Sequence, residues 1–337
     1  MATVEFHTGF DGCGSTNDLL SFFDGNQYHA SLDITNGYDN SKCLRLSRSY
    51  YDAGFIYKNV SPAKTKDCAF HFKFTEYSSG SEYFEFVGPG IKIRFSGSST
   101  GIDVYRGSTK LCDSGGIAPP LSPMITHVEI KVFSDASIGT VQLWLNGSIV
   151  IDQSGLNTGG QDISSIKFFN NDGYGSRYLY IDDLAIADDW IGHSTVEKKS
   201  PISDSSIAFT PSTGTDNYAM IDDSGHDGDA TYVETVVTGQ DLYGYETVDA
   251  GKEIVAVSLV TVARKTGAGK YPVYLQSATK QDAVEYLKSQ RALGVQYPCV
   301  QGSGFYDEYP TSPDGSAWTP AIWNAMQLGF KATLTSP

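Results

Sequence analysis

The sequence predicts an all-β protein of two domains, and three observations lead to this prediction. Glycine, tyrosine and phenylalanine are abundant, at 35, 21 and 17 of 337 residues; aromatic side chains fit pleated sheets and glycine fits turns. Short segments of alternating apolar and polar residues recur between Gly-rich turns, which is typical of a β-sandwich. A chain of this length exceeds one ordinary hydrophobic core.

The charge and hydropathy of the chain argue against nucleic acid and membrane as partners. The formal net charge is −15 and both halves of the chain are acidic, so the surface repels phosphate backbones and we expect no nucleic-acid partner. No apolar run approaches the roughly 20 residues of a membrane span, and the N-terminus lacks the basic and apolar parts of a signal peptide. We therefore expect a soluble protein with no membrane partner.

Cysteines and histidines are scattered. No C-x-x-C pair occurs, which predicts isolated and mostly buried thiols rather than a zinc site or a disulfide framework. The histidines show neither metal-ligand spacing nor a Ser/His/Asp order, so we expect each to be structural. These residues are Cys13, Cys43, Cys68, Cys112 and Cys299, and His7, His29, His71, His127, His193 and His226.

In the first domain, alternating segments predict strands at residues 4–10, 44–47, 55–58, 68–75, 83–87, 91–95 and 102–105. The segment at 68–75 is the clearest, because Phe70, Phe72 and Phe74 share one face and His71 and Lys73 the other.

Strands are also expected at residues 126–133, 140–151 and 163–169. Asn146-Gly147 predicts a type I′ hairpin turn, since both residues accept a positive φ. Residues 176–192 predict the last strand and the exit of the first domain. On a regular pleated strand Asp182 and Asp183 would point to opposite faces and could not serve one site.

The first domain also resembles a known family. The resemblance rests on three motifs in order: His127-Val-Glu-Ile-Lys-Val, Gly139-Thr-Val-Gln-Leu-Trp-Leu-Asn-Gly and Tyr180-Ile-Asp-Asp-Leu. Over residues 4–190 the chain resembles the laminin-G-like, concanavalin A-like lectin/glucanase sandwich of many phage and prophage virion proteins. This resemblance implies a jelly-roll sandwich, which we place at residues 1–192.

A polar stretch at 193–206 predicts a linker or a strand crossing between domains, followed by a smaller β-rich domain at 207–337. Strands are expected at 217–221, 230–237, 253–262 and 271–276, and residues 253–262 are apolar on both faces, which favours a central strand. Residues 279–293 fit either a helix or a loop and strand. One short helix is predicted, with Thr319 as N-cap, Pro320 first and Gly329 as its C-terminal stop, before a strand at 330–334.

Residues 200–334 resemble the C-terminal portion of the same phage proteins. The motifs are Asp229-Ala-Thr-Tyr-Val, the apolar segment at 254–265 and Trp318-Thr-Pro-Ala-Ile-Trp-Asn. Together the two resemblances imply a non-enzymatic virion structural protein, on the tail or decorating the capsid. They imply a homo-oligomer that contacts other virion proteins, with the lectin-like domain displayed toward host-surface glycans.

Two other functions are weighed against this one. The first alternative is a free or cell-surface glycan-binding lectin. The less favoured alternative is a polysaccharide-degrading enzyme, because the Glu-x-Asp-x-x-Glu motif of the glucanases in this sandwich family is absent. Its nearest substitute is Glu82 with Glu85, whose spacing of three puts the carboxylates on opposite faces of a strand.

An acidic loop partly matches a twelve-residue calcium loop, with Asp223, Asp227, Asp229 and Glu234 at positions 1, 5, 7 and 12. Position 3 is Gly225, which has no side-chain oxygen, and a strand rather than a helix is expected after the loop. We therefore favour a turn in which aspartates cap backbone amides, and no cofactor, with Ca²⁺ as the alternative.

Tyrosines offer the remaining candidate contacts, because tyrosines in Gly- and Asp-rich loops can stack on sugar rings or on a partner. For any one of them, packing or a subunit interface is the preferred interpretation. The candidates are Tyr50, Tyr51, Tyr174, Tyr243, Tyr245, Tyr306 and Tyr309.

Overall fold

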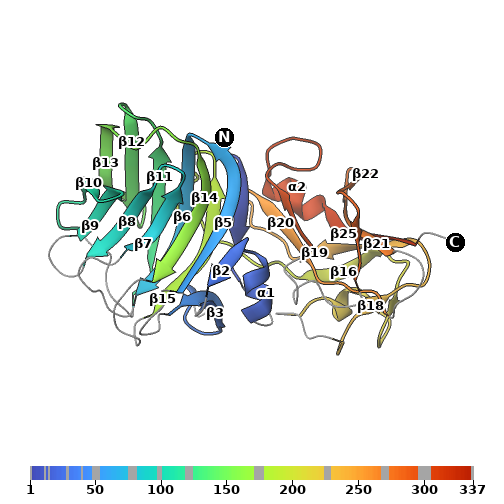
Figure 1. The fold of residues 1–337 in the computed structure, drawn as a ribbon. Helices are drawn as coiled ribbons and strands as arrows, with labels where there is room; N and C mark the ends of the chain where they lie inside the picture. Colours follow the sequence, from blue (N-terminus) through green and yellow to red (C-terminus); the bar gives the residue numbers. More distant parts are fainter. Residues whose placement is uncertain are drawn as a thin grey trace. The chain divides into compact units, whose positions relative to one another are not determined.

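The structure is a computed structural model of the chain. It describes residues 2–10, 13, 16–27, 30–38, 41–47, 54–74, 82–96, 101–117, 124–170, 178–223, 229–266, 273–294 and 305–334. The chain forms two compact units, one of residues 1–11 with 22–196 and one of residues 12–21 with 197–337 (Figure 1).

The first unit is a sandwich of two antiparallel sheets (Figure 1). The eight-stranded sheet has the order β13 (Ser148–Leu156), β12 (Gly139–Leu145), β11 (Thr126–Phe133), β6 (Thr65–Phe74), β15 (Leu179–Ala187), β4 (Cys43–Leu46) and β3 (Ala30–Asp33), with β1 (Val4–Thr8) also paired to β15. The seven-stranded sheet has the order β10 (Thr109–Asp113), β9 (Gly101–Arg106), β8 (Ile91–Ser96), β7 (Glu82–Val87), β14 (Ile163–Asn170), β5 (Gly54–Ala63) and β2 (Gly25–Gln27).

Aromatic rings from both sheets meet in the core of the sandwich. Phe70 of β6 lies 5.7 Å from Phe84 of β7 and 5.1 Å from Phe168 of β14, between ring centroids. Phe72 lies 4.8 Å from Phe95. The predicted alternation is confirmed at Phe70 and Phe72, which are 1% and 2% exposed, and each buried ring contributes about 2 kcal/mol of hydrophobic stabilisation.

Strand β15 lies inside the eight-stranded sheet, between β6 and β4, and all nine of its residues are buried. It contains a β-bulge between Asp182 and Ala185, where Asp183 takes a left-handed φ of 48°. The extra residue interrupts the alternation, so the prediction that Asp182 and Asp183 point to opposite faces is wrong. Both carboxylates lie beside His71 of β6: Asp182 is its register partner, and Asp183 Oδ2 lies 3.0 Å from its Nδ1.

Two hairpin turns are set by residues with positive φ. Asn146 and Gly147, at φ values of 47° and 78°, join β12 to β13, which confirms the predicted type I′ turn. Asp282 and Ala283, at 49° and 68°, join β21 to β22. Residues 279–293 are therefore strands and turns rather than a helix.

The second unit contains a six-stranded antiparallel sheet and two small ones. The large sheet has the order β16 (Pro201–Ser206), β19 (Gly239–Tyr245), β25 (Gln327–Leu334), β21 (Val273–Gln281) and β22 (Val284–Leu287), with β23 (Arg291–Ala292) also on β21. The small sheets pair β17 (Thr210–Pro211) with β18 (Val233–Glu234) and β20 (Val257–Thr261) with β24 (Phe305–Tyr309). A 3-10 turn, η2, spans Tyr218–Met220.

Several assignments in this unit differ from the sequence analysis. The strand expected at 217–221 is replaced by the 3-10 turn η2. Residues 201–206, assigned to the linker, form β16, which pairs with β19. The apolar segment at 253–262 is not a central strand. Only residues 257–261 form a strand, β20, which pairs with β24 alone among the described residues, and Val260 is 44% exposed. Its apolar side chains instead pack beside Trp318 and Trp323 in a small hydrophobic cluster.

Helix α2 (Pro320–Ala325) begins where predicted, since Thr319 is its N-cap and accepts a hydrogen bond from the Ile322 amide. It ends before Met326 rather than at Gly329, which lies inside β25. A side chain at Gly329 would place Cβ 2.0 Å from the Asp241 carbonyl oxygen, so this glycine serves a close approach of strands. A second short helix, α1 (Thr16–Ser21), was not predicted.

Cys43 and Cys68 are free and buried and Cys112 is free and partly buried, as expected of isolated thiols, and Cys13 is buried. Cys299 lies outside the described residues. Among the helices that the structure describes, none has the length and apolar character needed to cross a membrane.

Candidate functional site

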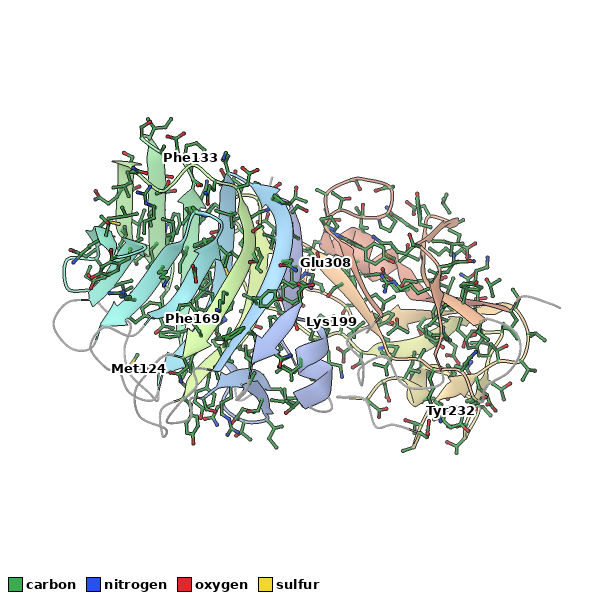
Figure 2. The ribbon with its side chains drawn as sticks, viewed as in Figure 1. Met124, Phe133, Phe169, Lys199, Tyr232 and Glu308 are labelled. Carbon is green, nitrogen blue, oxygen red and sulfur yellow. The ribbon has the colours of Figure 1, made fainter. Side chains whose placement is uncertain are left out.

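Polar and aromatic side chains gather on the outer face of the eight-stranded sheet. Val128 and Ile130 of β11 point into the core and are fully buried, so the residues that alternate with them point outward. Across the β11–β12 pair, Glu129 lies opposite Trp144 and Lys131 opposite Gln142. Figure 2 labels Met124, which lies two residues before β11, and Phe133, the last residue of β11.

Residues 188–196, the exit segment, lie across this outer face. The segment begins at Asp188, whose amide donates to the Thr3 carbonyl oxygen at 3.1 Å. In its middle the Gly192 amide donates to Glu129 Oε1 at 2.9 Å. Near its end the Val196 amide donates to Asp183 Oδ1 at 3.0 Å. The exit segment therefore buries several carboxylates that a bare sheet face would expose.

Two tryptophans form an exposed aromatic surface at one end of the exit segment. The ring centroids of Trp144 and Trp190 lie 6.2 Å apart at an angle of 41°, and Trp190 is 53% exposed. Beside Trp144 on β12, Gln142 donates to Asp152 Oδ1 at 3.0 Å. Lys131 pairs with Asp189, which precedes Trp190. We call these six residues, Lys131, Gln142, Trp144, Asp152, Asp189 and Trp190, the Trp platform.

The Trp platform has the chemistry of a polar ring binder. An exposed indole offers an apolar face for the C–H groups of a sugar ring, and the amide, carboxylates and ammonium around it can exchange hydrogen bonds with hydroxyl groups. Since Lys131 is already paired with Asp189, the exposed Asp152 leaves the rim acidic. That charge suits a neutral saccharide better than an anionic one.

A second group, the histidine cluster, lies beside the bulge of β15. It stacks Tyr38 on His71 at 4.1 Å, His71 against His127 at 5.1 Å and His127 against His193 at 4.3 Å, between ring centroids. His71 and His127 are 2% and 1% exposed, whereas His193 is exposed. Sequence spacing did not reveal the cluster, because its histidines come from β6, β11 and the exit segment.

Burial dominates the electrostatics of this cluster. It lowers the pKa of His127 to about 3, with smaller contributions from His71 and His193. It raises the pKa of Asp182 to about 8, assisted by the neighbouring Asp183. Asp182 Oδ2 accepts hydrogen bonds from the Tyr38 amide and the Ser41 hydroxyl. The serine thus donates to a carboxylate rather than to a histidine, which differs from a nucleophile and base pair.

The predicted calcium residues are only partly described. Asp229 forms a bidentate ion pair with Arg264, with nitrogen–oxygen distances of 2.7 and 3.3 Å. Asp223 Oδ2 accepts from the Thr231 hydroxyl, and Glu234 belongs to β18. Asp227 lies outside the described residues. The predicted turn without a cofactor and its Ca²⁺ alternative both stay untested, and the Arg264 guanidinium already occupies the Asp229 carboxylate.

The candidate tyrosines separate into two groups. Tyr50, Tyr51 and Tyr174 lie outside the described residues, and Tyr306 belongs to β24 without a described side chain. The others do not lie in exposed loops as expected: Tyr243, Tyr245 and Tyr309 belong to strands β19 and β24.

Contacts within the second unit bury these three tyrosines. Tyr243 is fully buried and donates to Asp241 Oδ2 at 2.8 Å. Tyr309 is 5% exposed and lies under the Lys288 ammonium, 4.0 Å from its ring centroid. Tyr245 is partly buried against Trp323. These three rings pack within the second unit, which agrees with the preferred interpretation of packing rather than with the alternative of an exposed sugar contact.

Glu85 lies on β7 in the seven-stranded sheet, opposite Lys92 and Lys167 on the two neighbouring strands. The side chain of Glu82 is not described. Across the part of the chain that the structure describes, no three His, Cys, Asp or Glu side chains are arranged to hold a metal ion.

Sequence reasoning overlooked both tryptophans of the platform. A signal was present: Trp144 alternates with the buried Leu143 and Leu145 and so must face outward. Trp190 follows two aspartates at the end of the last strand of the sandwich. Neither observation alone pairs the two rings, because the pairing depends on the path of the exit segment.

No family model and no curated protein matches this chain. Solved structures with a similar fold include domain 4 of AbnA, a GH43 extracellular arabinanase from Geobacillus stearothermophilus, in complex with arabinotriose. It has 14% identity and a TM-score of 0.39 and covers 56% of this chain and 93% of its own.

Two further structures are similar at the same level. A carbohydrate esterase from Shiga toxin-encoding bacteriophage phi24B has 11% identity and a TM-score of 0.38 and covers 56% of this chain and 100% of its own. A GH131 β-glucanase catalytic domain from Podospora anserina has 11% identity and a TM-score of 0.35, with coverages of 56% and 98%.

Proposed function

We propose that this protein is a non-enzymatic structural component of a phage virion, on the tail or decorating the capsid. In this proposal the first unit contacts host-surface glycans through the Trp platform and the second unit serves assembly. The observation that carries the glycan contact is the pair of tryptophans, one of them 53% exposed, flanked by hydrogen-bonding side chains on a sheet face.

The virion placement is supported by the sequence resemblance described above. In the structure its three motifs lie on β11, on β12 with the Asn146-Gly147 turn, and on the bulged strand β15. The same motifs thus contain one tryptophan of the platform and the acidic pair of the histidine cluster. The motifs that carry the family resemblance therefore contribute residues to the sheet face on which we place the glycan contact.

Binding is favoured over catalysis by the burial of the acid–base groups. His71 and Asp183, which lie 3.0 Å apart, are 2% and 5% exposed, and Tyr38 stacks on the His71 ring. A catalytic pair must reach its substrate within hydrogen-bond distance. On the Trp platform the carboxylates Asp152 and Asp189 already accept hydrogen bonds from Gln142 and Lys131.

Substitution of Trp190 tests the glycan contact. We expect the Trp190→Ala variant to lose glycan binding about tenfold or more on a glycan array and in titration calorimetry, because the stacking face is removed. Trp190→Phe should retain most of the binding. Ile138→Ala, which removes a 63% exposed apolar side chain elsewhere on the first unit, is the matched control. Equal binding by Trp190→Ala and the wild type would exclude the platform.

Proteomics of purified particles tests the virion placement. Peptides of this chain in virions at a stoichiometric level would support it, and their absence from every particle fraction would refute it. Glycan binding by a protein absent from particles would favour the alternative of a free or cell-surface lectin. Release of saccharide products would instead favour a polysaccharide-degrading enzyme.

A further inference from the structure

The backbone on either side of Gly192 is held by two buried carboxyl groups. The Ile191 amide lies 3.2 Å from both Asp67 Oδ2 and Glu129 Oε1, and the Gly192 amide donates to Glu129 Oε1 at 2.9 Å. Gly192 has a left-handed φ of 81°. Two successive amides converging on one oxygen around a left-handed residue form an anion-binding nest. Trp190 directly precedes these two residues.

The two carboxyl groups are buried together. Asp67 and Glu129 are 0% and 1% exposed, and Asp67 Oδ1 has no hydrogen-bond partner among the described residues. Burial raises the pKa of Asp67 well above its usual value, and the neighbouring Glu129 raises it further. Two carboxylates cannot both be charged in such a place, so the pair holds one proton and one negative charge.

One proton shared by Asp67 and Glu129 explains which group donates and which accepts each hydrogen bond. When Asp67 carries the proton, its hydroxyl donates to Glu129, and Glu129 Oε1 also accepts from the two backbone amides. The charge is then delocalised into the nest of the exit segment. Without the proton, two charges would share a site that contains two amide donors.

Other titratable groups surround the Asp67–Glu129 pair. Lys131 on β11 favours the charged form, but it also pairs with Asp189 of the exit segment. The remaining neighbours contribute no acceptor to the nest: they are His127 on β11, Lys66 and Cys68 on β6, and His193 on the exit segment. Lys66 is paired with Glu5 of β1.

We propose that Asp67 and Glu129, sharing one proton, are positioning residues that fix Trp190 in the Trp platform. Loss of the shared proton as pH rises releases the exit segment and separates Trp190 from Trp144. The consequence for glycan binding rests on the proposed function, whereas the positioning of Trp190 does not depend on it. The sign follows from the raised pKa of Asp67: the arrangement is complete at lower pH and is lost as pH rises through that pKa.

The test uses the full-length protein labelled with 5-fluorotryptophan. The chain has four tryptophans, so four fluorine resonances are expected, and single Trp→Phe variants assign them. Hydrogen exchange of the Ile191 and Gly192 amides is measured on the same samples. Three variants separate charge from contact: Glu129→Ala removes the acceptor, while Glu129→Gln and Asp67→Asn replace the shared proton by a fixed N–H donor.

The proposal makes distinct predictions for these variants. Glu129→Ala should shift the Trp190 resonance and speed exchange of both amides by about tenfold or more, since two hydrogen bonds to a charged group are lost. Glu129→Gln and Asp67→Asn should keep the Trp190 resonance that the wild type has at lower pH and abolish its change as pH rises. Glu85→Gln, on the other sheet, should retain both the resonance and its pH response.

Two results would overturn the proposal. One is unchanged amide exchange at Ile191 and Gly192 in Glu129→Ala. The other is a change of the Trp190 resonance with rising pH that persists in Asp67→Asn, and this result is decisive even if Glu129→Ala does not fold. None of these readouts uses a ligand, so a wild-type protein that binds no glycan would refute the proposed function without touching this test.

Discussion

Replacing His127 by phenylalanine should remove an acid sensitivity from the first unit. Burial lowers the pKa of this histidine from 6.5 to about 3. The folded state therefore excludes a proton that the unfolded chain binds below pH 6.5. The stability that neutral His127 allows is fully present above that pH and is lost as pH falls toward 3.

The magnitude follows from the two pKa values. Each unit of pH below 6.5 costs the folded state about 1.4 kcal/mol. Between about pH 6.5 and pH 4.5 the contribution of His127 is therefore roughly 2.5 kcal/mol. The side chain is 1% exposed, so solvent does not screen this effect appreciably.

The comparison must be made as a difference between variant and wild type. His7, whose pKa burial lowers to about 4, shifts stability in the same direction. Asp182, with a pKa raised to about 8, opposes it, because its protonated form is favoured in the folded state as pH falls. Both groups are present in each protein, so subtracting the two stability curves leaves the contribution of His127.

At neutral pH we expect the His127→Phe variant to be at least as stable as the wild type. Neither ring nitrogen of His127 has a hydrogen-bond partner among the described residues, so phenylalanine forfeits none. The backbone of His127 keeps its hydrogen bonds with Asn146.

Urea unfolding of the 5-fluorotryptophan-labelled protein provides the measurement. The Trp144 resonance reports the first unit alone, which is necessary because a chain of two units need not unfold in one step. A variant advantage that grows by about 2.5 kcal/mol from pH 6.5 to 4.5 would confirm the reasoning. An advantage that stays constant across this range, or a large loss of stability at pH 7, would refute it.

Two further predictions concern the second unit. Gly329→Ala should destabilise it by about 2–3 kcal/mol, because Cβ would lie 2.0 Å from the Asp241 carbonyl oxygen, whereas Gly251→Ala, at an open position, should be neutral in thermal and urea unfolding. Asp241→Ala should cost about 3 kcal/mol or more in the same assays, because this buried carboxylate accepts four hydrogen bonds. Two come from the backbone amides of residues 208 and 209, one from the Asn217 side-chain amide and one from the Tyr243 hydroxyl. Tyr243→Phe, which removes only one of these bonds, should cost about 1 kcal/mol; equal losses in the two variants would show that Asp241 does not organise the four donors.

Local sequence signals predicted the elements whose causes are local. Alternation at Phe70 and Phe72 identified the inner face of β6, and Asn146-Gly147 identified a hairpin because both residues tolerate positive φ. Thr319 before Pro320 identified the start of α2. In each case a few adjacent residues determine the backbone.

The features that sequence reasoning missed depend on neighbouring strands. Asp183 adopts a left-handed φ only because β15 must pair with β6 on both sides of a bulge. Gly329 resembled a helix stop, but it serves the approach of β25 to β19. Tyr243 lies in a Gly- and Asp-rich stretch typical of a loop, yet it is paired in a sheet and fully buried.

Both the Trp platform and the burial of the carboxyl groups depend on the path of the exit segment. Without the exit segment, the outer face of the eight-stranded sheet would expose Glu129 and Asp183 to water, where neither needs a backbone partner. With it, their oxygens bind amides of residues 191, 192 and 196.

Burying acidic groups in this way rarely increases stability relative to well-packed apolar residues. Asp67 and Asp182, whose pKa values are raised by burial, therefore do not contribute to the face by stabilising it in their charged forms. What Asp67 provides, together with Glu129, is a set of directional hydrogen bonds to the Ile191 and Gly192 amides. These bonds fix the backbone beside Trp190 more uniquely than apolar contacts, which lack direction. This is the physical reason to look for function at the Trp190 end of the exit segment rather than at the buried histidines.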